Sequence, residues 1–265
     1  MCITLEKSEM TATIVGGAVN YKNQTHTLLY KNTVQNLSAR PNALVLPIMG
    51  KVLKVEDTTP FNKFMDEIVD NTRPSFRGAK SVSFGSVKTY KVGAYTIIEA
   101  ENATPVAMMR AIKKLQPEQR PDMTDALLQW YKDHYNNPTL LLCCFTGTDT
   151  LSSQPIMVEY EPRNFNSFLV PGADDHHGYI PSMGSYTDRD HTLIFGQYKK
   201  PTLVMGGNTM KFSQDVPMQL QNGIWDSTKL PNTGKNCDWV YVKDPTSFTW
   251  SLQEAVTKEE IASLF

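Results

Sequence analysis

The side chains best suited to acid–base or metal chemistry gather in one stretch, residues 168–196. The stretch contains three of the five histidines and four aspartates: His176, His177, His191, Asp174, Asp175, Asp188 and Asp190. Imidazole nitrogens and carboxylate oxygens bind metal ions, and imidazole also transfers protons near neutral pH. The stretch is therefore the first candidate for a functional site.

The segments on either side of these polar residues are typical of β-strands. Phe168 to Val170 precedes a Pro171-Gly172 turn, and Thr192 to Phe195 is a β-branched and aromatic run. The histidines and aspartates therefore belong to a long loop between two strands. Long loops are often functional, because the scaffold on each side holds their side chains toward a partner.

A metal-dependent hydrolase is one interpretation of this loop. His176, His177 and His191, with Asp174 or Asp190, are its candidate ligands, and His176 or His177 and Asp190 surround an activated water. Adjacent histidines on an extended chain point to opposite faces, so they meet one ion only in a tight turn, which Gly178 permits. The spacing matches neither a helical His-Glu-x-x-His nor a Cys-x-x-Cys motif. In the alternative interpretation, Asp174 and Asp190 accept backbone N–H bonds in turns and His191 forms a hydrogen bond beside the strand. Both interpretations stay open, so the sequence assigns no metal to this loop.

Cys2 is a second candidate for chemistry. If the initiator methionine is removed, its thiol and its α-amino group belong to one amino acid. The amine, with an ordinary pKa near ~8, can take the proton of a thiol whose ordinary pKa is about 8.5. One residue then supplies both the nucleophile and the general base. The other cysteines, Cys143, Cys144 and Cys237, lack that option.

On this Met-Cys start followed by a strand and hairpin, the chain resembles the N-terminal-nucleophile (Ntn) cysteine hydrolases of the bile-salt hydrolase and penicillin V acylase kind. The resemblance covers roughly the first fifty residues. It implies cleavage of linear amide bonds inside an αββα sandwich. Those enzymes carry a Gly-Arg-x-x-Asp-like segment, whereas this chain has Gly16-Gly17-Ala18-Val19-Asn20, without the arginine and with asparagine in place of the carboxylate.

A second resemblance is to an uncharacterised family that also starts Met-Cys. It is carried by two segments, Pro41-Asn42-Ala43-Leu44-Val45-Leu46-Pro47 and Asp190-His191-Thr192-Leu193-Ile194-Phe195-Gly196. This resemblance implies that Cys2 and the histidine-rich loop are features of one fold. It implies nothing about a substrate.

Composition restricts the classes of protein. The chain has 265 residues, 40% of them hydrophobic, and a net charge of −1, which gives no strong signal for nucleic-acid binding. No uninterrupted apolar run approaches the ~18 residues of a membrane-spanning helix, and the start lacks the pattern of a signal peptide. Cys143-Cys144 lies within an apolar run, which favours reduced, buried thiols and a cytoplasmic location.

The periodicity predicts an α+β fold of mostly antiparallel sheets with several packed helices, with an αββα-like sandwich as the specific form. Predicted helices follow Thr58-Thr59-Pro60, Thr104-Pro105 and Thr124, and a last one begins at Thr257. Predicted strands include residues 25–30, 43–48, 95–100, 139–145, 155–160, 202–205 and 239–242, whereas 211–235 is expected to be irregular. We expect a single domain over residues 1–265, with 101–138 as a helical insertion.

These patterns leave three functions open. The first is a cysteine amidase or acyl transferase acting on an amide-containing small molecule, with Cys2 as nucleophile and Asn42 or backbone N–H groups holding the oxyanion. The second is a non-enzymatic binding or assembly protein, whose protein partner contacts the aromatic and amide-rich residues 219–225 and 232–239. The third is the metal-dependent hydrolase. No cofactor is indicated, and a homo-oligomer stays open.

Overall fold

The computed structural model describes residues 3–72, 90–198, 208–221, 223–230, 233–237, 239–244 and 249–255. Cys2, the predicted strand 202–205 and the predicted terminal helix lie outside these residues. The α-helices are α1 (Phe64–Thr72), α2 (Pro105–Ile112) and α3 (Asp125–His134). Short 3-10 turns are η1 (Thr59–Phe61), η2 (Glu101–Ala103) and η3 (Pro117–Gln119). The strands are β1 (Ile3–Thr4), β2 (Ser8–Asn20), β3 (Thr25–Asn36), β4 (Asn42–Ile48), β5 (Gly50–Val55), β6 (Tyr90–Val92), β7 (Tyr95–Ala100), β8 (Thr139–Phe145), β9 (Leu151–Ser152), β10 (Ile156–Pro162), β11 (Phe168–Pro171), β12 (Tyr186–Asp188), β13 (Thr192–Tyr198), β14 (Asn208–Thr209), β15 (Ile224–Lys229), β16 (Thr233–Lys235), β17 (Trp239–Asp244) and β18 (Thr249–Ala255).

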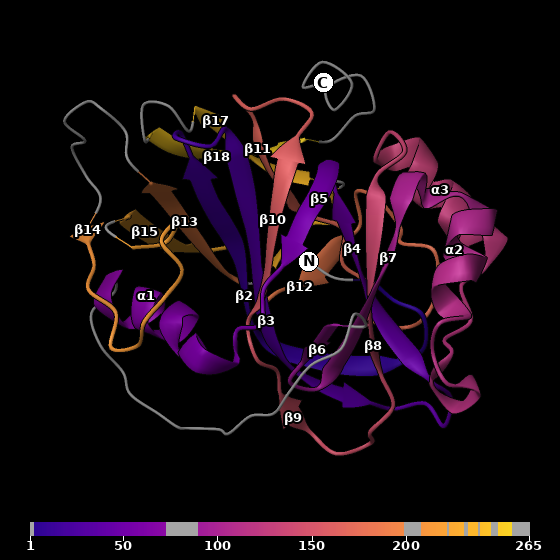
Figure 1. The fold of residues 1–265 in the computed structure, drawn as a ribbon. Coiled ribbons are helices and arrows are strands. Elements are labelled where there is room, and N and C mark those ends of the chain that lie inside the picture. Colours follow the sequence, from indigo (N-terminus) through magenta and orange to yellow (C-terminus); the bar gives the residue numbers. More distant parts are fainter. Residues whose placement is uncertain are drawn as a thin grey trace.

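Two large sheets form the centre of the molecule (Figure 1). The first has the strand order β1-β4-β8-β7-β6, and all its pairs are antiparallel. The second has the order β14-β15-β13-β2-β3-β10-β5, with β9 also paired to β3. In this second sheet β13 runs parallel to β2, so the sheet is mixed. Smaller sheets pair β11-β17-β18 and β12-β16.

Three hydrophobic clusters hold these layers together. One cluster lies between the large sheets and includes Leu28, Phe195 and Leu141. The second joins Leu140 and Leu142 to α2 and α3, and the third packs α1 on the outer face of the mixed sheet. Successive residues of a strand point to opposite faces, so β8 supplies both of the first two clusters. This explains why residues 139–145 are apolar without interruption.

The helices begin where the capping residues predict, with one difference. The Thr104 hydroxyl accepts a hydrogen bond from the Ala107 N–H at 3.1 Å, and Thr124 caps Leu127 in the same way at 3.2 Å. Pro105 occupies the first turn of α2. After Thr58-Thr59-Pro60, however, the chain makes the 3-10 turn η1, and α1 begins only at Phe64.

The predicted fold class is confirmed in its coarser form. The described part of the chain is mostly β, with antiparallel and mixed sheets and three α-helices. The expected irregular segment 211–235 contains β15 and β16, because pairing with β13 and β12 offsets the weak β propensity of its polar residues. Residues 101–138 contain α2 and α3 between the neighbouring strands β7 and β8. The domain organisation itself stays a prediction. No helix of the described residues is long and apolar enough to cross a membrane.

His26 is an ionisable residue that is buried in the core. Its side chain is fully buried on β3, where Tyr160, Phe165 and Phe168 surround the ring. Because the Phe165 carbonyl can only accept, the Nε2–H of His26 donates to it, at 2.9 Å. Nδ1 has no hydrogen-bond partner among the described residues. Burial is the main reason that the pKa of His26 falls to about 4, since this environment disfavours the imidazolium.

We therefore expect acid to destabilise the fold through His26. Below pH 6.5 the imidazole becomes protonated in the unfolded chain but stays neutral in the folded chain until about pH 4. The contribution of the neutral His26 ring to the free energy of unfolding is fully present above pH 6.5. It falls by about 3 kcal/mol as the pH falls toward 4. Urea unfolding at several pH values measures the loss. His26→Gln should flatten the dependence between pH 6.5 and 4, whereas His177→Gln, at an exposed histidine, should leave it unchanged; equal slopes in all three proteins would contradict the prediction.

Candidate functional site

The histidine-rich loop between β11 and β13 brings some of its predicted residues together. The Oδ1 atom of buried Asp174 lies 3.2 Å from Nε2 of His176 and 4.0 Å from Nε2 of His191. Asp190 lies on the other side of the His191 ring, 3.9 Å from Nδ1. His177 instead lies beside Asp175, at 3.7 Å, with most of its side chain exposed. Asp174, one of the two aspartates that the metal interpretation offered as a ligand, is therefore the centre of the cluster.

The electrostatics of this cluster favour one charged carboxylate and one neutral imidazole. Burial alone would raise the pKa of Asp174, but the hydrogen bond to His176 and the nearby rings of His176 and His191 contribute to holding it well below its ordinary value. Burial lowers the pKa of His191 to about 2, so its ring is neutral at neutral pH. The described residues contain no group of three or more histidine, cysteine or acidic side chains arranged to hold a metal ion.

The loop also holds the N-terminal strands in place. The N–H of Thr4 donates to the Asp175 carbonyl at 3.0 Å, and the N–H of Ser8 donates to the His176 carbonyl at 2.9 Å. The Asp190 carboxylate accepts from the N–H of Ala12, where β2 has a bulge and a positive φ of 52°. A side-chain acceptor satisfies a backbone donor that the irregular ladder leaves without a strand partner. Asp190 thus accepts a backbone N–H bond, as the second interpretation predicts, but the donor lies on a distant strand rather than in a turn of the loop.

Asn42 is buried at the start of β4, and hydrogen bonds occupy its side chain. Oδ1 accepts from the backbone N–H of Glu6 at 2.9 Å and from the backbone N–H of the next residue, Ala43, at 2.8 Å. Nδ2 donates to the Glu6 carbonyl at 2.9 Å and to Oδ1 of Asn36 at 3.3 Å. The amide thus acts as a missing strand partner for Glu6, and these bonds leave it no donor for an oxyanion.

We expect Asn42→Ala to lower the free energy of unfolding by about 2–4 kcal/mol. The substitution leaves the N–H and carbonyl of Glu6 without partners, and buried orphaned groups cost about 1–3 kcal/mol each. Chemical denaturation of both proteins measures the difference. Asn23→Ala, in the exposed turn between β2 and β3, is the matched control and should be close to neutral. Equal losses for the two variants would show that the Asn42 network contributes nothing specific.

Comparison with known proteins gives a match in three dimensions only. No protein-family model matches the chain, and no curated protein matches its sequence. The crystal structure of baculovirus P35 superposes on 91% of this chain and 98% of its own length, with a TM-score of 0.51 and 15% identity. The chain has a P35-like fold.

Two further P35 structures match with TM-scores below 0.5. They are a mutated baculovirus P35 after caspase cleavage, with a TM-score of 0.44 and 14% identity, and the caspase-8/P35 complex, with 0.43 and 14%. The first covers 92% of this chain and 97% of its own, and the second covers 87% and 95%. The fold assignment rests on the first P35 structure alone.

The P35-like fold overturns the expected relation to the Ntn hydrolases. The similarity spans nine tenths of the chain, whereas the Met-Cys resemblance covered about fifty residues and lacked the arginine and the aspartate. The amidase or acyl transferase interpretation was therefore wrong, and the metal-dependent hydrolase is not supported either. The individual roles expected for Cys2, Asn42, His176, His177, Asp190 and His191 are not tested by this comparison. A Met-Cys start misled because one dipeptide carries little fold information.

On this P35-like fold, the exposed aromatic residues are not those that the sequence indicated. Leu220 and Trp225, from the expected surface 219–225, are buried in the cluster beneath α1, and Asn236 and Cys237 are buried as well. The exposed rings belong to the histidine-rich loop instead: Tyr179 is 73% exposed and Tyr186 75%. Exposed tyrosines provide contact area at low entropic cost, so residues 178–188, the tyrosine loop, are the candidate partner surface. The loop that the sequence singled out for its histidines therefore also carries these two exposed rings.

Proposed function

We propose that this chain is a non-enzymatic protein that binds and inhibits a cysteine protease of the caspase class. The observation that carries the proposal is the P35-like fold over 91% of the chain. P35 itself has been crystallised in complex with caspase-8 and after caspase cleavage. A binding role also agrees with the second sequence-based interpretation, that of a protein with an aromatic contact surface. The tyrosine loop is the surface that we propose for part of this contact.

Further details belong to the same proposal. We infer an αββα-like sandwich, supported by the order of the three clusters, in which α1 packs on one large sheet and α2 and α3 on the other. A cytoplasmic location is supported by Cys143 and Cys144, which are buried free thiols. A complex with a protease, rather than a small amide substrate, is the proposed assembly.

The test is an inhibition assay with purified full chain and a panel of caspases. We expect at least one caspase to lose its activity on a peptide substrate at near-stoichiometric ratios, and to elute with this chain in size-exclusion chromatography. Baculovirus P35 is the positive control, and a serine protease such as trypsin is the specificity control. Full activity of every caspase, without a complex, would remove the proposal. Inhibition of trypsin to the same extent would show a nonspecific effect.

A further inference from the structure

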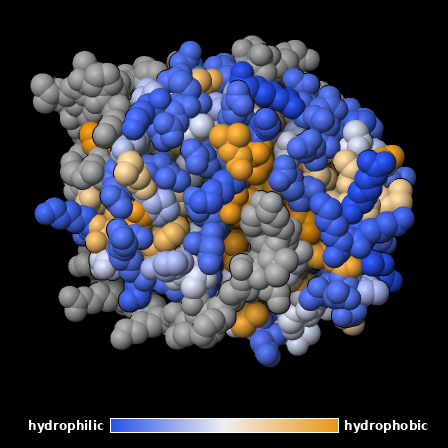
Figure 2. All heavy atoms as spheres, viewed as in Figure 1, coloured by the Kyte–Doolittle hydropathy of each residue, from blue (hydrophilic) through white to orange (hydrophobic). Residues whose placement is uncertain are grey.

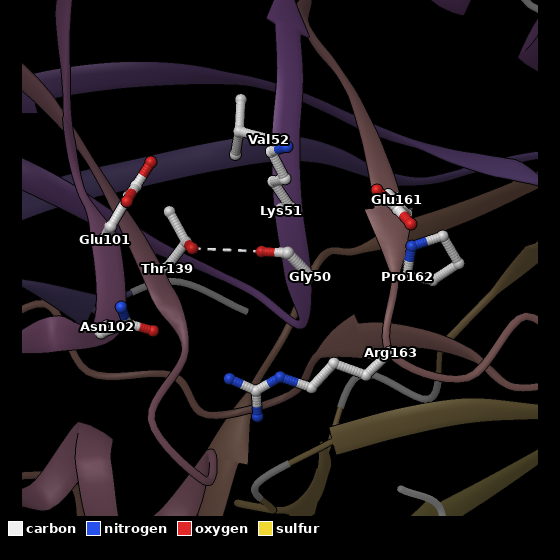
Figure 3. A pocket seen from close by; sticks show the side chains of 9 residues that line it. All are labelled: Gly50, Lys51, Val52, Glu101, Asn102, Thr139, Glu161, Pro162 and Arg163. Carbon is white, nitrogen blue, oxygen red and sulfur yellow. Dashed lines mark hydrogen bonds between the residues drawn. The ribbon is translucent and has the colours of Figure 1, made fainter.

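A polar pocket of about 500 Å³ opens where the two large sheets approach each other. Residues from four separate parts of the chain line it: Gly50, Lys51, Val52, Glu101, Asn102, Thr139, Glu161, Pro162 and Arg163. We name it the Arg163 pocket. Figure 3 shows the Arg163 side chain extending across the pocket toward Asn102, with Glu101 and Glu161 on opposite sides of Gly50 and Lys51. Its volume is within the range of ordinary ligand sites.

Arg163 is oriented in this pocket without a carboxylate partner. Two N–H groups of its guanidinium donate to the carbonyls of Asn136 and Asn137, residues that both have a positive φ. These bonds fix the plane of the group and leave three of its five donors for other acceptors. Arg163 is exposed to solvent at the pocket, and the partial burial of its guanidinium lowers its pKa. Among the described residues no acidic side chain forms an ion pair with it, although Glu101 and Glu161 line the same pocket.

The strand beside this pocket, β5, is an edge of the mixed sheet. Its described strand partner is β10, on one side. The carbonyl of Met49 faces β10, where it accepts a hydrogen bond from the N–H of Arg163. The carbonyl of the next residue, Gly50, faces the opposite, outer side of β5 and accepts from the Thr139 hydroxyl at 3.1 Å. Backbone groups alternate along a strand, so the N–H and carbonyl of Val52 face the outer edge as well.

The surface over β5 is suited to contact with another chain. Figure 2 shows hydrophobic side chains gathered over β5, in the middle of the face that it presents. Leu53 is the large apolar residue of this strand that is exposed, at 48%. Lys51 and Lys54 are exposed on the same strand. An extended peptide that adds to a sheet edge gains main-chain hydrogen bonds, and a neighbouring pocket gives it specificity.

We propose that the edge of β5 and the Arg163 pocket together bind an extended segment of a partner protein that carries a single acidic side chain. The segment pairs with the N–H and carbonyl of Val52, and its carboxylate accepts hydrogen bonds from the free donors of Arg163. A guanidinium and a carboxylate form strong, often two-pronged hydrogen bonds. A second acid is disfavoured, because Glu101 and Glu161 repel it. No residue of the tyrosine loop lines this pocket, and the inference goes beyond the proposed protease inhibition and does not depend on it.

The test is isothermal titration calorimetry of the full chain with an acetylated and amidated pentapeptide, Thr-Val-Asp-Val-Thr. We expect binding that weakens by about tenfold or more when asparagine replaces the aspartate in the peptide, since the charge-assisted bonds are lost. A peptide with N-methyl groups on alternate residues should bind as poorly, because it cannot pair with β5. Both comparisons use the unchanged protein, so they do not depend on how a variant folds.

Two protein variants complete the test. Arg163→Ala should weaken binding of the aspartate peptide to the level of the asparagine peptide, and Arg163→Lys should recover it in part. Absence of binding, or equal binding by Arg163→Ala and the unchanged chain, would overturn the inference. Equal affinity for acetyl-aspartate amide alone would assign the pocket to small carboxylates and overturn the peptide site. The assay contains no protease, so a chain that inhibits a caspase but ignores the peptide refutes only this inference.

Discussion

Gly16→Ala is expected to prevent folding, with a loss of more than about 4 kcal/mol in the free energy of unfolding. Gly16 lies in the middle of β2, between β3 and the parallel strand β13. A Cβ atom there would lie 1.8 Å from the carbonyl oxygen of Ile194, and the residue has a φ of +150°. The obstacle is backbone on a neighbouring strand, so relief requires β2 and β13 to separate along a ladder of seven paired residues. Urea unfolding followed by circular dichroism measures the result.

Gly147→Ala is the matched control for this substitution. The atom nearest to its added Cβ is Cδ1 of Leu151, at an ordinary 3.8 Å, and its φ is not positive. We expect this variant to unfold at the same denaturant concentration as the unchanged chain. A Gly16→Ala protein with a normal unfolding midpoint would show that β2 and β13 are not packed at this distance. The result also explains Gly16-Gly17, which stand where the Ntn enzymes carry their arginine segment: two neighbouring strands leave no space for a side chain.

Trp225→Ala is expected to cost about 3–5 kcal/mol of stability, as truncation of a large buried ring does. Trp225 is 1% exposed on β15 and contacts Phe212 edge to face at 6.3 Å. Gly196 on β13 leaves space for the indole, since a Cβ there would lie 2.7 Å from the ring. The Nε1–H has no hydrogen-bond partner among the described residues. Trp225→Phe should therefore be much milder, because it keeps most of the ring and removes a buried donor.

Tyr186→Ala provides the contrast on the tyrosine loop. With the side chain 75% exposed, the substitution should change stability by no more than about 0.5 kcal/mol. In the caspase assay, however, it should weaken inhibition if the loop contacts the protease. The opposite pattern, with Trp225→Ala neutral and Tyr186→Ala destabilising, would return the aromatic partner surface to residues 219–225. Thermal unfolding and the inhibition assay together separate these outcomes.

Local signals in the chain predicted much of the secondary structure. The caps at Thr104 and Thr124 act within one helical turn, so the sequence alone shows where α2 and α3 begin. The apolar run 139–145 predicted a strand buried on both faces, and β8 is that strand. The polar loop before β13 was likewise visible as a concentration of histidines and aspartates. Each of these features depends on residues that are close together in the chain.

Contacts between distant segments decided the rest. The hydrogen bond from Ala12 to Asp190 joins residues 178 positions apart, and the parallel pairing of β2 with β13 spans a similar separation. Such contacts depend on the register of whole strands, which no local pattern specifies. They determine that the Asn42 side chain forms hydrogen bonds with the backbone of Glu6, that Trp225 is buried and that Tyr186 is exposed. The residue types of this chain were therefore enough to find most of its strands and its prominent loop. The direction of each side chain, and with it the P35-like fold, came from tertiary packing.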